Sequence, residues 1–111
     1  MSGAAFRAVA DVPTASGSRY LQQLCKHWSH NLAVEYTPER GTVVFPRNAR
    51  GADWSGDACA LFEAKAETLT LTVRIDAAAP EQLEALKGVV ATHLDRFAFR
   101  EAPLTFDWRA G

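Results

Sequence analysis

Residues 25–30, Cys-Lys-His-Trp-Ser-His, place a thiol, two imidazoles and an indole within six positions. In a helix, His27 and His30 lie three residues apart, so both imidazoles can reach one ion. Imidazole binds zinc, copper, iron and nickel. Two histidines are nevertheless too few for a zinc site, which uses three or four protein ligands. Cys25 lies about 160° around the helix from His27 and cannot join the pair.

His93 is the third histidine, and it lies within the apolar arc of a second predicted helix. A histidine at such a position is more often a hydrogen-bonded core residue than a ligand. It can approach His27 only if the two helices run side by side. Two interpretations stay open: a metal or cofactor site, or His27 as a boundary residue with His30 as a helix-end cation opposing the macrodipole. We favour the second.

The tryptophans have two different environments in the sequence. Trp28 lies in the middle of an apolar helical stripe, and Trp108 lies on the apolar side of a predicted strand, so both are expected in the core. Trp54 lies in a polar, glycine-rich loop, Arg47–Gly56, close to Arg47 and Arg50. An aromatic ring in a basic loop can stack on a flat ligand or a partner. Folding back over the sheet edge is the alternative.

Residue types for nucleophilic catalysis are present without the context that catalysis needs. Cys25 and Cys59 are both predicted to point inward, where a thiol behaves as a small apolar group. No serine has the glycine context of a nucleophile elbow, and no glycine-rich phosphate loop follows a strand. No pair of carboxylates suggests a general acid and base. The sequence therefore predicts no catalytic residues.

Hydropathy periodicity predicts the elements that must position these residues. Apolar residues alternate in strands and recur at helical spacing in two helices, the first of which buries one stripe. The predicted order is a strand over 4–12, a helix from 18 to about 30, strands near 34–36 and 42–46, a loop over 47–57, strands over 58–66 and 68–76, a helix from 80 to about 99, and a closing strand over 104–108.

Both helices carry a single apolar stripe, so both should cover the same face of the sheet. We predict an α+β fold, a two-layer sandwich of a mainly antiparallel sheet with two helices on one face, in β-α-β4-α-β order. One domain should span residues 1–111. The uncovered face is predicted to carry Arg7, Thr70, Thr72, Arg74, Thr105, Asp107 and Arg109, more often a solvated surface than a ligand platform or a dimer face.

Composition excludes several classes of function. The net charge of −1 offers no electrostatic footprint for nucleic acid. No apolar run approaches the roughly 18 residues of a membrane span, and no signal peptide is evident. Two cysteines without framework spacing favour reduced thiols, hence a cytoplasmic location. We expect a homodimer, formed through the uncovered sheet face or an edge strand near residues 4–12.

Four stretches together resemble the bacterial domain-of-unknown-function family 2218: SRYLQQLCKHWSHN, VEYTPERGTVVFP, VVATHLDRFAFRE and LTFDW. The similarity spans essentially the whole chain. It implies a TATA-binding-protein-like fold with a β-α-β4-α arrangement, in agreement with the periodicity. It also implies a setting in bacterial iron or siderophore metabolism, with a siderophore-interacting flavin reductase as partner. It assigns no roles to the residues that match its motifs in position: His27, Trp28, His30, His93, Arg96 and Phe97.

The chain departs from this family between Pro46 and Cys59, where its loop is longer. Trp54 and the loop arginines are therefore poor candidates for a function shared with the family. We predict a small binding or accessory module rather than an enzyme, with no cofactor. The ligand-binding candidates are His27, His30, His93 and Trp54. The rival function is a small metal- or haem-dependent enzyme in which His27 and His30 bind the metal.

Overall fold

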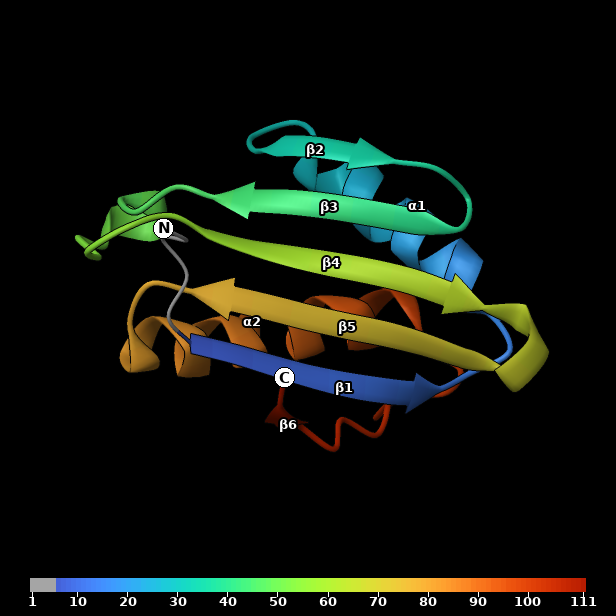
Figure 1. Ribbon diagram of the computed structural model, residues 1–111. Coiled ribbons are helices and arrows are strands. Elements are labelled where there is room, and N and C mark those ends of the chain that lie inside the picture. Colours follow the sequence, from blue (N-terminus) through green and yellow to red (C-terminus); the bar gives the residue numbers. More distant parts are fainter. Residues whose placement is uncertain (1–5) are drawn as a thin grey trace.

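A computed structural model of the chain describes residues 6–111. Six strands form one antiparallel sheet in the order β2-β3-β4-β5-β1-β6, and two helices pack on one of its faces (Figure 1). The predicted fold class and element order are confirmed. The elements are β1 (Phe6–Pro13), α1 (Gly17–Trp28), β2 (Ala33–Tyr36), β3 (Arg40–Phe45), β4 (Ala58–Lys65), β5 (Thr70–Ala77), α2 (Pro80–Phe97) and β6 (Arg109–Ala110), with short 3-10 turns η1 (Ala49–Gly51) and η2 (Ala66–Thr68).

The two faces of the sheet differ because side chains alternate along each strand. In β5, Leu71, Val73 and Ile75 point toward the helices and are fully buried, whereas Thr72 and Arg74 point away and are half-exposed. The same alternation holds in β1 and β4, which pair with β5 on either side. The helices therefore pack on a continuous apolar face of the sheet.

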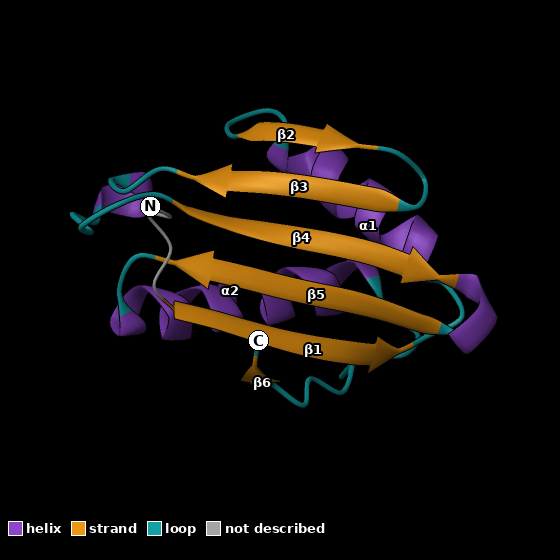
Figure 2. Cartoon of the chain, viewed as in Figure 1, coloured by secondary structure: helices purple, strands orange, loops and turns teal. Residues whose placement is uncertain are grey.

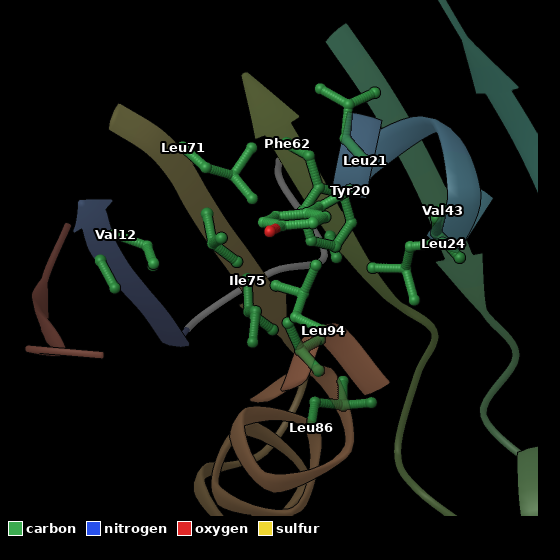
Figure 3. Packing of buried hydrophobic residues seen from close by; sticks show 14 of the residues in the cluster. Val12, Tyr20, Leu21, Leu24, Val43, Phe62, Leu71, Ile75, Leu86 and Leu94 are labelled. Carbon is green, nitrogen blue, oxygen red and sulfur yellow. The ribbon is translucent and has the colours of Figure 1, made fainter. Parts of the chain in front are cut away.

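Helix α1 is held on that face by the stripe expected from its sequence. Tyr20, Leu21, Leu24, Cys25 and Trp28 are all buried. Figure 3 shows Leu21 pointing toward the strands, with Tyr20 and Leu24 among the buried side chains of the sheet and of α2. Fully burying one large apolar side chain contributes roughly 1.5–3 kcal/mol, so this stripe fixes the position of α1. The helix ends at Trp28, two residues before the predicted end.

Strand β1 is an interior strand, and β2 and β6 form the two edges (Figure 2). The prediction of an edge strand near residues 4–12 was therefore wrong. Its alternation was correct, since Ala8, Ala10 and Val12 are buried, but alternation alone cannot distinguish an edge from the interior. Ala4, predicted on the same face, lies outside the described residues.

The closing strand is shorter and lies later than predicted. Residues 104–108 make no ladder, and within the C-terminal segment only β6 pairs with β1. The backbone N–H of Leu104 donates instead to Asp95 Oδ1 of α2, at 2.9 Å, and the Leu104 side chain is buried. A side chain of the helix thus replaces the neighbouring strand as hydrogen-bond partner. Thr105 and Asp107 are exposed on this segment rather than on the sheet.

Gln82 fastens the loop after β3 to the beginning of α2. Its side chain is 1% exposed, accepts the Ala78 N–H at 2.7 Å and donates to the Gly56 carbonyl at 3.0 Å. Within the loop, the Trp54 N–H donates to the Arg47 carbonyl at 2.9 Å. The loop is therefore held over the helical side of the sheet, beside α2.

The uncovered face carries several ion pairs. Asp76 is 6% exposed and pairs with Arg7 at 2.5 Å and with Arg74 at 3.3 Å, and Asp11 pairs with Arg109 at 2.9 Å. The strand residues predicted for this face lie on it. Within residues 6–111, neither helix is long and apolar enough to span a membrane.

Candidate functional site

Two histidines meet where α1 and α2 pass each other. The ring centroids of His27 and His93 lie 5.9 Å apart, and Phe97, one turn after His93, lies 5.9 Å from His27. Nearer the start of α1, Tyr20 contacts Glu101, which follows α2. The helices therefore run in opposite directions, and their facing edges form a seam. The sequence allowed this approach of His93 to His27 only for side-by-side helices, and the structure has that arrangement.

A cleft of about 380 Å³ opens beside the two imidazoles. We call it the histidine cleft. Its floor is aromatic: the Trp28 ring lies 5.1 Å from the His93 ring and meets Phe45 edge to face at 5.2 Å. The residues that line it come from α1 and its end, β3 and the following loop, and α2: His27, Trp28, Asn31, Leu32, Phe45, Pro46, Ala49, Val89 and His93.

The His93 ring is oriented by its own helix. Its Nδ1–H donates to the Val89 carbonyl at 2.7 Å. A carbonyl oxygen can only accept, so in the neutral ring Nδ1 carries the hydrogen and Nε2 carries the lone pair. Among the described residues, no group bonds to Nε2. The half-buried His93, which lines the cleft, therefore has a hydrogen-bond acceptor without a partner among the described residues.

A smaller pocket of about 150 Å³ continues the cleft along α2. We call it the tryptophan pocket, because Trp54 forms one of its walls opposite Gln82 and Leu86. The two spaces share Phe45, Pro46, Ala49 and Val89 as lining residues. Together they form one groove between α2 and the loop after β3, with the two imidazoles at one end and the Trp54 indole at the other.

Nucleophiles and metal ligands are poorly represented around this groove. Cys25 is fully buried on the opposite side of α1, and burial raises the pKa of its thiol from 9.0 to about 11, so it stays protonated. Within residues 6–111, no three His, Cys, Asp or Glu side chains are grouped to hold a metal ion. Two imidazoles and the Asn31 amide do not fit a resident metal centre. They fit hydrogen bonding to a ligand.

The predicted site residues fall into two sets. His27 and His93 line the histidine cleft, and Trp54 lines the adjoining pocket. His30 is exposed beyond the end of α1 and is not among the residues lining either space. Trp28 is core, 7% exposed, as expected, and Trp108 is half-buried against the core.

Sequence reasoning missed Phe45, Asn31, Val89 and Gln82 as residues that line the groove. A usable signal was present for the histidines. His27 lies at the border between the apolar and polar sides of its helix, and His93 lies within the apolar arc of the other helix, so the two can meet where helices on one sheet face lie side by side. No comparable signal marks Phe45 or Val89, since each resembles an ordinary core residue in the sequence.

Comparison with known proteins places the chain in a family. The family described as "Uncharacterized protein conserved in bacteria (DUF2218)" matches residues 9–109. The chain belongs to the DUF2218 family. The match includes every residue that lines the histidine cleft and the tryptophan pocket, so both spaces lie within the DUF2218 region.

A solved structure has a similar fold. The NMR structure of PA4090 from Pseudomonas aeruginosa is similar, with a TM-score of 0.70 and 31% sequence identity. The match covers 95% of this chain and 96% of that one. A search of curated proteins finds no match. The comparisons thus establish family and fold, and the function has to be argued from the groove.

Proposed function

We propose that this protein is a binding module whose groove takes a flat aromatic ligand with a hydroxyl group. The observation that carries this proposal is His93, whose fixed tautomer presents an acceptor nitrogen within a cleft walled by aromatic rings. A phenolic hydroxyl would donate to Nε2. Its ring would lie against Trp28 and Phe45, where stacked and edge-to-face contacts are favourable.

The size and chemistry of the groove agree with a small ligand. Binding clefts are mostly apolar with a few placed polar groups, and here three polar side chains, His27, Asn31 and His93, border the aromatic floor. A nucleophile–base pair is absent from the residues that line it. Binding without chemistry is therefore the function that the groove supports best.

The chemical class agrees with the setting implied by the family resemblance. Catechols, flat rings with adjacent hydroxyls, are iron-chelating groups, and the resemblance implies bacterial iron or siderophore metabolism. We therefore propose a catechol-bearing compound as the natural ligand. We also propose a siderophore-interacting flavin reductase as partner. Co-purification of the two tagged proteins tests that partner, and no retention at micromolar concentration would count against it.

Titration with catechol tests the proposed function. Amide shifts in ¹⁵N NMR spectra should move saturably around His27, Trp28 and Val89. His93→Phe keeps a ring of similar size but removes the acceptor, and it should weaken binding about tenfold, the equivalent of one hydrogen bond of about 1.4 kcal/mol. His30→Phe is the matched control and should bind like the wild type. Equal affinities of the two variants would refute the proposed role of His93.

A metal- or haem-dependent enzyme is the second candidate, because two imidazoles share the histidine cleft. A metal ion held by these two histidines would need further ligands from a bound molecule or from water, since two protein ligands leave its coordination incomplete. Metal analysis of protein purified without a His tag tests this function. Stoichiometric metal that is lost in the His27→Ala, His93→Ala double variant would favour it over the binding module.

Self-association is a separate proposal. The uncovered face and the edge strand β2 are the surfaces available for a second copy. Light scattering at high micromolar protein concentration tests the homodimer. A species of the monomer mass, 12.1 kDa, would contradict it.

A further inference from the structure

A second cavity lies at the other end of the seam between the helices. It has a volume of about 350 Å³ and is lined by Arg19, Tyr20, Gln23, Phe97, Phe99 and Arg100. We call it the arginine cavity. It shares no lining residue with the histidine cleft. Phe97 stands between the two spaces, since it lines the cavity and its ring also contacts His27.

The charges around the arginine cavity are unbalanced. Neither Arg19 nor Arg100 takes part in the ion pairs formed within residues 6–111. The neighbouring carboxylate, Glu101, accepts hydrogen bonds from the hydroxyls of Tyr20 and Thr14. Its bond to Tyr20 is the main reason that the pKa of this buried phenol is raised above 10.0. Two arginines thus line the cavity, and the neighbouring carboxylate already has partners, which leaves positive charge at the cavity.

An exposed aromatic ring borders the same cavity. The Phe99 side chain is 71% exposed, more than any other large exposed hydrophobic of the described residues. The Arg100 guanidinium lies 5.7 Å from the centre of that ring, in reach of a cation–π contact. Leaving a phenylalanine in water is unfavourable, and a ligand that covered it would recover that free energy.

We propose that the arginine cavity binds a small organic carboxylate with a flat apolar body. A carboxylate matches the planar fork of a guanidinium and can accept two parallel hydrogen bonds from it. Arg19 and Arg100 would hold the carboxylate from α1 and from the end of α2, and the apolar body would lie against Phe97 and Phe99. This site is independent of the function proposed for the histidine cleft.

Benzoate is the probe that combines both features, and two simpler molecules separate them. Benzyl alcohol keeps the ring without the charge, and inorganic phosphate keeps negative charge without the ring. In ¹⁵N NMR titrations, benzoate should shift the amides of Gln23, Phe99 and Arg100 saturably and bind at least tenfold more tightly than either simpler molecule. Its affinity should fall as sodium chloride is added, because an exposed ionic contact is screened by salt.

Variants at the cavity provide the decisive comparison. Arg19→Gln and Arg100→Gln should each weaken benzoate binding at least tenfold, whereas Arg40→Gln, an exposed arginine on β3, should leave it unchanged. Glu101→Gln keeps an acceptor for Tyr20 but removes the competing negative charge, so it should tighten binding severalfold. This variant also tests the proposal if either arginine variant is unstable.

Three results would overturn the proposal. Benzoate affinity could be the same in Arg19→Gln, Arg100→Gln and the wild type, or it could be unchanged in Glu101→Gln. Phosphate could bind as tightly as benzoate, which would show that Phe97 and Phe99 do not contribute to binding. His93→Phe should not alter benzoate binding, so failure of this site and failure of the catechol site are separately visible.

Discussion

Gly41 lies on β3 at a point where α1 packs tightly against the sheet. A Cβ atom added to this residue of β3 would lie 2.6 Å from Cys25 Sγ, 3.3 Å from Tyr36 Cβ and 3.6 Å from Leu21 Cδ1. Carbon atoms essentially never come within 3.0 Å of such neighbours. Gly41→Ala therefore forces the thiol, and with it the helix, away from β3.

The expected loss of stability follows from two opposing effects. Overpacking a filled core costs about 1–3 kcal/mol, and Cys25 is fully buried, so its sulfur has no space to enter. Alanine in a strand is better than glycine by roughly 0.5–1 kcal/mol because it restricts the unfolded chain. We expect Gly41→Ala to lower the free energy of unfolding by about 1–2 kcal/mol.

A double-mutant cycle isolates the contact. Cys25→Ala alone should cost about 1 kcal/mol, the transfer value of one buried group the size of a methylene. In the double variant, the new methyl group occupies the space that the sulfur has left. Its stability should therefore be close to that of Cys25→Ala alone, with a favourable coupling of at least about 1 kcal/mol. Urea unfolding of the four proteins, followed by tryptophan fluorescence, measures this value.

The same variants connect the contact to the groove. Cys25 precedes His27 and Trp28 on α1, so displacement of the helix should also misplace the wall of the histidine cleft. Catechol should bind more weakly to Gly41→Ala and recover in the double variant. Losses of stability that simply add, within about 0.5 kcal/mol, would refute the steric argument. Full catechol affinity in the destabilised single variant would refute its link to the cleft.

Three further predictions concern individual side chains. Burial raises the pKa of the Cys25 thiol from 9.0 to about 11. The thiol's contribution to the free energy of unfolding is therefore complete below pH 9, and about 2–3 kcal/mol of it is lost as the pH rises to 11. Urea unfolding should show that Cys25→Ala loses less stability at alkaline pH than the wild type, and equal losses would contradict this. Gln82→Ala should lower the free energy of unfolding by about 2–4 kcal/mol, because it leaves the Ala78 N–H and the Gly56 carbonyl unpaired. Gln23 is exposed, so Gln23→Ala should change that free energy by no more than about 0.5 kcal/mol. Similar melting temperatures of the two variants would contradict this difference. Trp28→Ala should lower the free energy of unfolding by about 3–5 kcal/mol, and His30→Ala by at most about 1 kcal/mol. Thermal melts that show equal losses of stability would mean that residues 25–30 are not divided between core and surface.

Most of the fold was predictable because local periodicity determines it. Strict alternation in residues 68–76 and the stripe of α1 each identify a buried face, and faces that must be buried together determine the layers. The position of β1 inside the sheet was not predictable in this way. It depends on where the C-terminal segment pairs, and the register that joins Ala8 to Ala110 and Val9 to Arg109 brings together residues from distant parts of the chain.

The sequence identified some of the residues that line the groove, but it did not predict which of them contact one another. His27, His93 and Trp54 were identified from the sequence, and the structure places all three along one groove. Sequence spacing favoured His27 with His30, because neighbours on one helix are visible in the sequence. Contact between His27 and His93 depends on the opposite directions of two helices 66 positions apart in the chain, 93 − 27, and periodicity carries no information about that direction.

The place of β1 between β5 and β6 has a consequence for synthesis on the ribosome. The strand made first has both of its neighbours in the second half of the chain, and its register with β5 pairs Phe6 with Ala77. During translation, strands β2 to β5 can pair with one another in the order of their synthesis, whereas β1 has to wait for a strand that emerges about sixty residues later. The nascent chain therefore carries β1 as an unpaired, partly apolar strand until β5 has emerged, and during that period a chaperone could bind it.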